Sequence, residues 1–244
     1  MAESDERQAN LKEHNRQRRR AERAEQVARW YFRLNGFLSI PGFVVHPDVV
    51  RLNPMTEADL IAVRFPHSRE VIAGRPMQDD ERLLSLARNQ QTLFLLVEVK
   101  TDLCNINGPW SNADQGNMQR VIRRLGFAED DQMEDIAASM YRELRWEDQN
   151  TVLQYVAVGK RKNDGRGRQF ARLAQVTWDE IAQFLYKRFQ QFPEKLPSDG
   201  RLIHEQWPDF GRAYGRRFRR MKSSRESEEF VLDYIENERV LRAS

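Results

Sequence analysis

The chain has 244 residues, 32% of them charged, and a formal net charge of +3 at pH 7. No run of about 18 apolar residues occurs, which argues against a membrane-spanning segment, and the polar start lacks the apolar centre of a secretion signal. The single cysteine, Cys104, excludes an internal disulfide and a cysteine-based zinc cluster. We therefore expect an intracellular, cytoplasmic protein long enough for one domain with extensions.

The N-terminal region divides into a charged segment and a helix. Residues 1–18 are polar and basic, and we expect them to be disordered or frayed. From about residue 20 to 34, apolar residues recur at three- and four-residue steps, which predicts a helix, and Asn35-Gly36 is a typical helix end. A core is expected over 19–190.

Two apolar segments further along the chain are typical of neighbouring core strands. The segment 58–65 begins with an acid, Asp59, and the segment 93–100 ends with Glu98 and Lys100. Strand side chains alternate, so Glu98 and Lys100 share one face. If the strands pair, Asp59 comes beside Glu98. Two converging carboxylates predict a hard-cation site, with Mg²⁺ as the expected ion and Mn²⁺ as a substitute.

These residues resemble a known family. Asp59, followed on a later strand by Glu98-Val99-Lys100, is similar to the D…ExK signature of the PD-(D/E)XK, or restriction-endonuclease-like, nucleases. Ala58 stands where the family name has proline. The resemblance covers about residues 20–176. It implies an α/β fold: a central mixed sheet of four to five strands flanked by helices, in the order α-β-β-β-α-β.

The resemblance also implies roles for individual residues. Asp59 and Glu98 would be metal ligands, and Val99 would give its backbone carbonyl to the metal. Lys100 would be the catalytic lysine. Glu25 on the first helix would be an additional ligand, usually through water. Glu22, one turn earlier, competes for this role, and an ordinary exposed glutamate is an equally good interpretation of Glu25.

The segments around the site residues leave several alternatives open. The long connection 66–91 includes a short predicted helix at 79–89 and is a candidate flap over a substrate. After Lys100, Asn107 and Trp110 could contact a nucleotide, although Trp110 as an anchor on the core is favoured. Gln119, on a predicted helix at 114–125, is a further site candidate. Arg123 stands four residues later, where one branch of the family has tyrosine.

Basic residues gather in two later stretches. Helix 131–146 and strand 151–158 lead to a basic, glycine-rich turn at 159–168, and then come a strand at 170–176 and a helix at 177–189. A basic helical extension is expected over 191–244. The candidate phosphate contacts are Lys160, Arg161, Lys162, Arg216, Arg217, Arg219 and Arg220, although the basic turn is equally well interpreted as a solvated end of the sheet. Tyr214 and Phe218 alternate with the second group, which suits base stacking, but also a helix that buries its aromatic residues.

The expected function is that of a Mg²⁺-dependent deoxyribonuclease, acting as an endonuclease in defence against foreign DNA or in DNA repair. The main alternative is an inactive nucleic-acid-binding module of the same fold, and a third is a scaffold subunit. DNA is the expected partner, and the terminal helix at 226–241 could also support a homodimer. No motif for a nucleotide cofactor is present.

Overall fold

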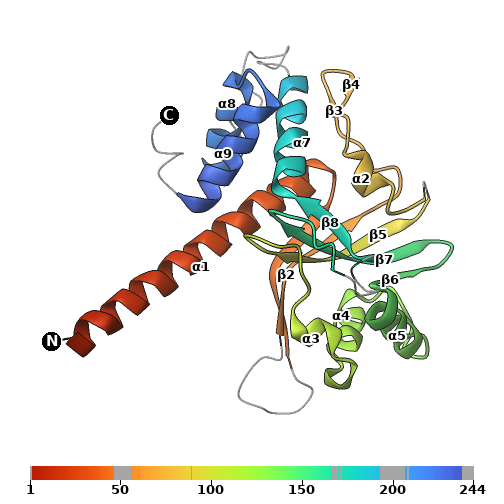
Figure 1. Cartoon of the computed structure of the whole chain (residues 1–244). Coiled ribbons are helices and arrows are strands. Elements are labelled where there is room, and N and C mark those ends of the chain that lie inside the picture. Colours follow the sequence, from red (N-terminus) through yellow and green to blue (C-terminus); the bar gives the residue numbers. More distant parts are fainter. Residues whose placement is uncertain are drawn as a thin grey trace.

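The protein is an α/β structure in which a central mixed sheet has helices on both faces (Figure 1). The computed structural model describes residues 2–46, 56–88, 90–165, 170, 172–192, 207 and 209–237. The strands are β1 (Leu38–Val45), β2 (Thr56–Arg64), β3 (Val71–Ile72), β4 (Arg75–Pro76), β5 (Thr92–Val99), β6 (Arg145–Glu147), β7 (Thr151–Gly159) and β8 (Ala174–Thr177). The helices are α1 (Ala2–Leu34), α2 (Glu81–Leu84), α3 (Gly108–Ser111), η1 (Ala113–Gln115), α4 (Asn117–Leu125), α5 (Met133–Glu143), α7 (Trp178–Gln191), α8 (Asp209–Arg220) and α9 (Ser224–Glu236).

The sheet has the order β1-β2-β5-β7-β6, with β8 also paired to β7. β1, β2 and β5 are antiparallel neighbours, whereas β5 and β7 are parallel. β6 pairs with the first half of β7 and β8 with its second half, so the two share one edge of β7. Six strands therefore occupy five positions, and the predicted mixed sheet of four to five strands flanked by helices is confirmed at that level.

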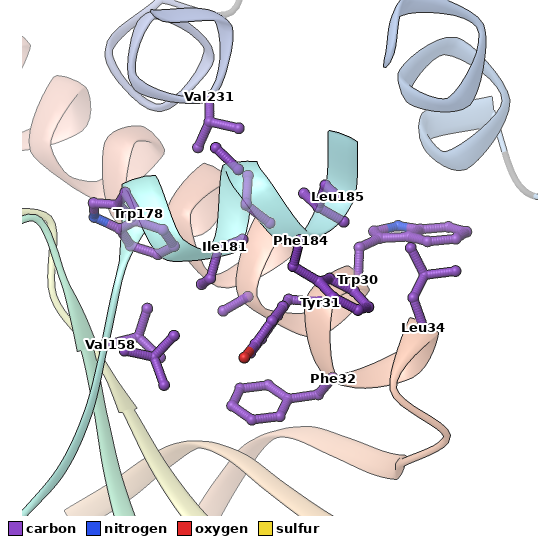
Figure 2. Packing of buried hydrophobic residues seen from close by; sticks show 14 of the residues in the cluster. Trp30, Tyr31, Phe32, Leu34, Val158, Trp178, Ile181, Phe184, Leu185 and Val231 are labelled. Carbon is purple, nitrogen blue, oxygen red and sulfur yellow. The ribbon is translucent and has the colours of Figure 1, made fainter. Parts of the chain in front are cut away.

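Both faces of β5 are buried, as its apolar pattern predicts. Leu93, Leu95 and Val97 belong to a core shared with α1, α7, α8 and α9. Leu96 belongs to a second core, formed with α4 and α5 on the other face. Figure 2 shows the first core, where Trp30 and Tyr31 of α1 lie against Phe184 of α7. β5 is thus a central strand. Glu98 and Val99, at its end, lie at the edge of these two cores.

The first helix is much longer than predicted. Residues 1–18 were expected to be disordered or frayed, but α1 is helical from Ala2 onward. This part of the sequence consists mainly of good helix formers, namely Ala, Glu, Gln, Lys and Arg. Side-chain pairs four residues apart add support: Gln17 bonds to Glu13, and Arg18 pairs with Glu22 at 3.2 Å. A high proportion of charged residues is therefore not sufficient to predict disorder in this segment.

Two other predicted helices are shorter than expected. The segment 131–146 is helical only to Glu143, because Leu144 adopts φ +56° and the chain turns into β6. The segment 79–89 forms only the four-residue α2. By contrast, the helix predicted at 177–189 is found as α7, which begins with a capping box in which Thr177 N–H donates to Glu180 Oε2 at 2.8 Å. None of the helices in the described ranges is long and apolar enough to cross a membrane.

The connection between β2 and β5 is fixed to the body by buried polar contacts. Arg188 of α7, which is fully buried, pairs with Asp79 and with Glu70. Tyr31 OH donates to Asp80 Oδ2 at 2.8 Å. Because this connection joins the end of β2 to the start of β5, it lies at the sheet end opposite to Asp59 and Glu98. This position does not suit the flap that was considered for residues 66–91.

The C-terminal helices complete the first core rather than extending from it. Phe218 of α8 stacks on Phe189 of α7, with ring centroids 5.4 Å apart. Tyr214 and Phe218 are buried, which matches the interpretation of a helix that packs its aromatic residues inward. The predicted extension at 191–244 also includes residues 193–206, 208 and 238–244. These ranges lie outside the described residues.

Candidate active site

Asp59 lies near the start of β2, where the regular pairing with β5 stops. The last paired residues are Leu60 and Val97. Beyond them, Val99 N–H donates to the side-chain oxygen Oδ2 of Asp59 at 2.6 Å. The carboxylate therefore takes the place of a backbone acceptor at the end of the β2–β5 ladder. This contact fixes Asp59 against the Glu98-Val99-Lys100 segment, as the sequence predicted for paired strands.

Glu98 is held at the end of β5 by three side chains. Lys100 Nζ lies 2.5 Å from Glu98 Oε1, and Asn107 Nδ2 donates to the same oxygen. Tyr155 OH donates to Oε2 at 3.2 Å. Lys100 Nζ also donates to Asn107 Oδ1 at 2.8 Å, which closes a ring of three side chains. The Glu98 side chain is 1% exposed and that of Lys100 is 30% exposed.

The negative charges of Asp59 and Glu98 are only partly balanced by the positive charge of Lys100. Burial and, after it, the charge of Asp59 together raise the pKa of Glu98 to about 7, against the opposing effects of Lys100 and Tyr155. The pKa of Asp59 is also raised by burial, although the Val99 N–H and Lys100 act in the opposite direction. Proximity and burial thus disfavour two negative charges here unless a further cation is bound.

Glu25, on the first helix, lies near enough to the strand carboxylates for their charges to act on it. Burial raises its pKa to about 7, and the charges of Asp59, Glu57, Glu22 and Glu98 act in the same direction. Glu22 itself is exposed and pairs with Arg18. Of the two glutamates that competed for this role, Glu25 is therefore the one positioned next to the strand carboxylates. Glu57 is exposed.

The loop that carries Asn107 is fixed by a close approach to β7. Lys160 N and Arg161 N both donate to Asp102 O, and Cys104 N donates to Arg161 O at 2.9 Å. A Cβ atom at Gly159 would lie 2.7 Å from Cys104 N, so only glycine allows the loop to lie this close. The loop is thereby held on the strand next to Glu98, and Asn107 reaches back to the site.

Sequence reasoning missed part of this arrangement. Tyr155 lies on β7 and was included only in an apolar strand, although a hydroxyl in such a strand needs a buried partner, which is a usable signal. Asn107 was considered as a nucleotide contact, whereas its amide bonds to Glu98 and Lys100. Trp110 is fully buried, so it anchors the loop as favoured.

The donor set fits a divalent cation in its chemistry. Within the described ranges, no group of three or more His, Cys, Asp or Glu side chains is arranged to hold a metal ion. Asp59 and Glu98 nevertheless provide hard oxygen ligands on adjacent strands, with raised pKa values that a cation would relieve. The residues that would hold Mg²⁺ are Asp59, Glu98 and the carbonyl of Val99, with Glu25 close to them.

The remaining predicted contacts do not join this group. Gln119 Nε2 donates to Glu134 Oε2 on α5 at 3.1 Å, which links two helices. Arg161 pairs with Asp102 and Lys162 with Glu180, while Lys160 is exposed. Residues 166–168 of the predicted basic turn lie outside the described residues.

The α8 arginines have varied surroundings. Arg216, Arg217 and Arg220 are exposed, and Arg219 is half-buried. The guanidinium of Arg217 lies over the ring of Phe230, 5.8 Å from its centroid. Because Tyr214 and Phe218 are buried, they offer no stacking face for a base between these arginines.

Known proteins were compared with the chain in three ways. Neither protein-family models, nor curated proteins, nor solved structures give a match.

Proposed function

We propose that the protein is a metal-dependent nuclease with a restriction-endonuclease-like core, which hydrolyses phosphodiester bonds of DNA. The observation that carries this proposal is the meeting of Asp59, Glu98 and Lys100 at one end of the β2–β5 pair. Glu25 supports it, because it approaches from a separate element. DNA repair or defence against foreign DNA are the settings we propose.

The chemistry divides between the cation and the protein. Mg²⁺ or Mn²⁺, when bound, neutralises charge on the phosphate and polarises a water molecule. Lys100 is partly exposed and is held next to Glu98, so its ammonium can donate to a phosphate oxygen or orient the attacking water. Asn107 and Tyr155 hold the Glu98 carboxylate from both oxygens, which fixes the direction of its lone pairs.

Cleavage of supercoiled plasmid and linear duplex DNA with Mg²⁺ or Mn²⁺ tests the proposal. Asp59→Asn and Lys100→Ala should each lower the cleavage rate at least about 100-fold, as loss of a metal ligand or a positioned proton donor does. Plasmid nicking by the wild type would establish endonuclease action. Two matched controls are available: Glu57→Gln, on the same strand as Asp59, and Glu22→Gln, one turn before Glu25. Both should retain cleavage, whereas Glu25→Gln should lower it.

Thermal unfolding gives a second measurement that needs no substrate. A cation that binds only the folded state raises the unfolding free energy by about 2.7 kcal/mol at 100 times its Kd. We expect Mg²⁺ to raise the melting temperature of the wild type and to do so much less in Asp59→Asn. Absence of cleavage with intact DNA binding and no response to Mg²⁺ would reject the nuclease and favour an inactive binding module.

A further inference from the structure

The N-terminal half of α1 extends away from the body of the molecule (Figure 1). Residues 6–19, which we name the projecting segment, are all exposed. Isolated helices of about this length are marginally stable in water, and most helical stability in proteins comes from the packing of an apolar face. The projecting segment therefore needs an explanation beyond the fold of the domain, and its composition indicates what it can contact.

The charge of the projecting segment favours an anionic partner. It contains five Lys or Arg residues and two Glu residues, a net charge of +3, which equals the net charge of the whole chain. Its only large apolar side chain is Leu11, which is 61% exposed. A coiled coil with a second copy requires an apolar stripe, and a single leucine does not supply one. A regular polyanion suits this surface better.

The orientation of the segment links it to the candidate site. A helix turns about 100° per residue, so side chains 7, 11 or 18 residues apart lie within about 20° of one direction. Arg18, His14 and Arg7 precede Glu25 by these intervals. They form the Glu25 stripe, which continues outward from the site carboxylates. With a rise of about 1.5 Å per residue, Arg18 lies about 10 Å and Arg7 about 27 Å from Glu25 along the axis.

The opposite side of the helix is a built-in comparison. Lys12, Arg16 and Arg19 point about 120° to 180° away from Glu25 and form the opposite stripe. They line a hollow of about 810 Å³ next to the end of α9. There, Arg23 donates to the carbonyls of Ile235 and Glu236 at 2.9 Å each. The opposite stripe thus faces α9 rather than the site.

We propose that the projecting segment is an arm that binds the phosphate backbone of a nucleic-acid duplex engaged at Asp59 and Glu98, through Arg7 and Arg18 of the Glu25 stripe. This inference rests on the proposed nuclease function for its link to the site. A span of about 27 Å corresponds to about 8 base pairs of duplex. The arm would therefore make binding depend on duplex beyond the bond that is cut, with no preference for sequence.

Binding of a fluorescent 30-base-pair duplex, measured over a range of salt concentrations without divalent metal, tests the arm. Each phosphate contact contributes about 0.9 to the slope of log Kobs against log salt. The double variant Arg7→Glu/Arg18→Glu should lower the slope by about two and weaken binding at least tenfold at low salt. The matched variant Lys12→Glu/Arg16→Glu should change affinity less than threefold. Equal effects of the two variants, or no effect of the first, would overturn the proposal.

Helix loss is controlled within this design. Arg16 and Arg18 each have a glutamate partner on the same helix, Glu13 and Glu22, so both double variants break one such pair. Circular dichroism should give the same helicity for both. A helicity loss limited to Arg7→Glu/Arg18→Glu would be resolved with Arg7→Gln/Arg18→Gln, which keeps good helix formers and should still lower the slope by about two.

The failure of this inference can be separated from the failure of the nuclease proposal. A small chromogenic phosphodiester is too short to reach Arg18, so its Mg²⁺-dependent hydrolysis should be unchanged in Arg7→Glu/Arg18→Glu. If the wild type cleaves neither plasmid nor the small diester but binds duplex through the Glu25 stripe, the nuclease proposal fails and the arm stands. If long duplex is cleaved and bound by the arm variant as by the wild type, the arm is rejected and the nuclease stands.

Discussion

The two ends of the β2–β5 pair both bring aspartates and glutamates into partly buried positions, but they treat the charges differently. At the end where the 66–91 connection attaches, Asp79 pairs with Arg64 at 2.9 Å and with the buried Arg188. At the other end, Asp59, Glu98 and Glu25 have one salt-bridge partner between them among the described residues, Lys100. Carboxylates that are matched by cations hold structure together, whereas an excess of buried carboxylates over cations raises their pKa values and favours the binding of a further cation. This difference separates a structural cluster from a candidate site within one sheet.

The largest expected effect on stability comes from removing a cationic side chain at the end of the β2–β5 pair where Asp79 lies. Arg188→Leu leaves Asp79 and Glu70 without their buried partner, which should lower the free energy of unfolding by about 3 to 5 kcal/mol. Urea denaturation measures this change. Arg161→Leu is the control, since its pair with Asp102 is exposed and should be worth less than about 1 kcal/mol. If Arg188→Leu lowers the free energy of unfolding by less than about 1 kcal/mol, the proposed difference between the two ends of the β2–β5 pair is wrong.

The pH dependence of stability should sharpen the contrast at the end of the β2–β5 pair that carries Asp59 and Glu98. The pKa of Glu98 is raised from 4.5 to about 7, so its stabilising contribution is full below pH 4.5 and is lost as the pH rises through 7. Without metal, Glu98→Gln should match the wild type near pH 4.5. It should exceed the wild type by about 2 to 3 kcal/mol near pH 8. Urea denaturation across this range is the measurement, and a difference that does not vary with pH would contradict it.

The smallest expected effect comes from removing one hydroxyl oxygen at each end of the β2–β5 pair. Tyr155→Phe removes a donor to Glu98, and Tyr31→Phe removes a donor to Asp80; each should cost about 1 kcal/mol. Only Tyr155→Phe should move the ionisation of Glu98 to higher pH, because the Tyr155 hydroxyl opposes the rise of that pKa. Both hydroxyls stay protonated, since burial raises their pKa values well above 10. The free energy of unfolding of Tyr155→Phe and of Tyr31→Phe, each measured as a function of pH, tests this difference. Parallel pH dependences of the two variants would contradict it.

Local patterns predicted the sheet and the central part of the candidate site. The continuous apolar run of β5 and the acid near the start of β2 depend only on neighbouring residues, and strand pairing then brings Asp59 to Glu98. Asn107 and Tyr155 could not be placed in this way. Their contacts depend on the path of the loop over Gly159 and on the register of β5 with β7, which are long-range properties. The helical start of α1 was missed because its charge was weighed above its helix propensity.

The clamp between the first and last helices has a consequence for the order of folding. Arg23 bonds to the carbonyls of Ile235 and Glu236, and Tyr234 OH donates to Gln26 Oε1 at 2.7 Å. These contacts surround Glu25 on either side in the sequence, yet they join residues more than 200 positions apart. Contacts of such long range form late and slow folding. Because α1 precedes α9 in the chain, α1 gains this support during synthesis only after α9 has been made.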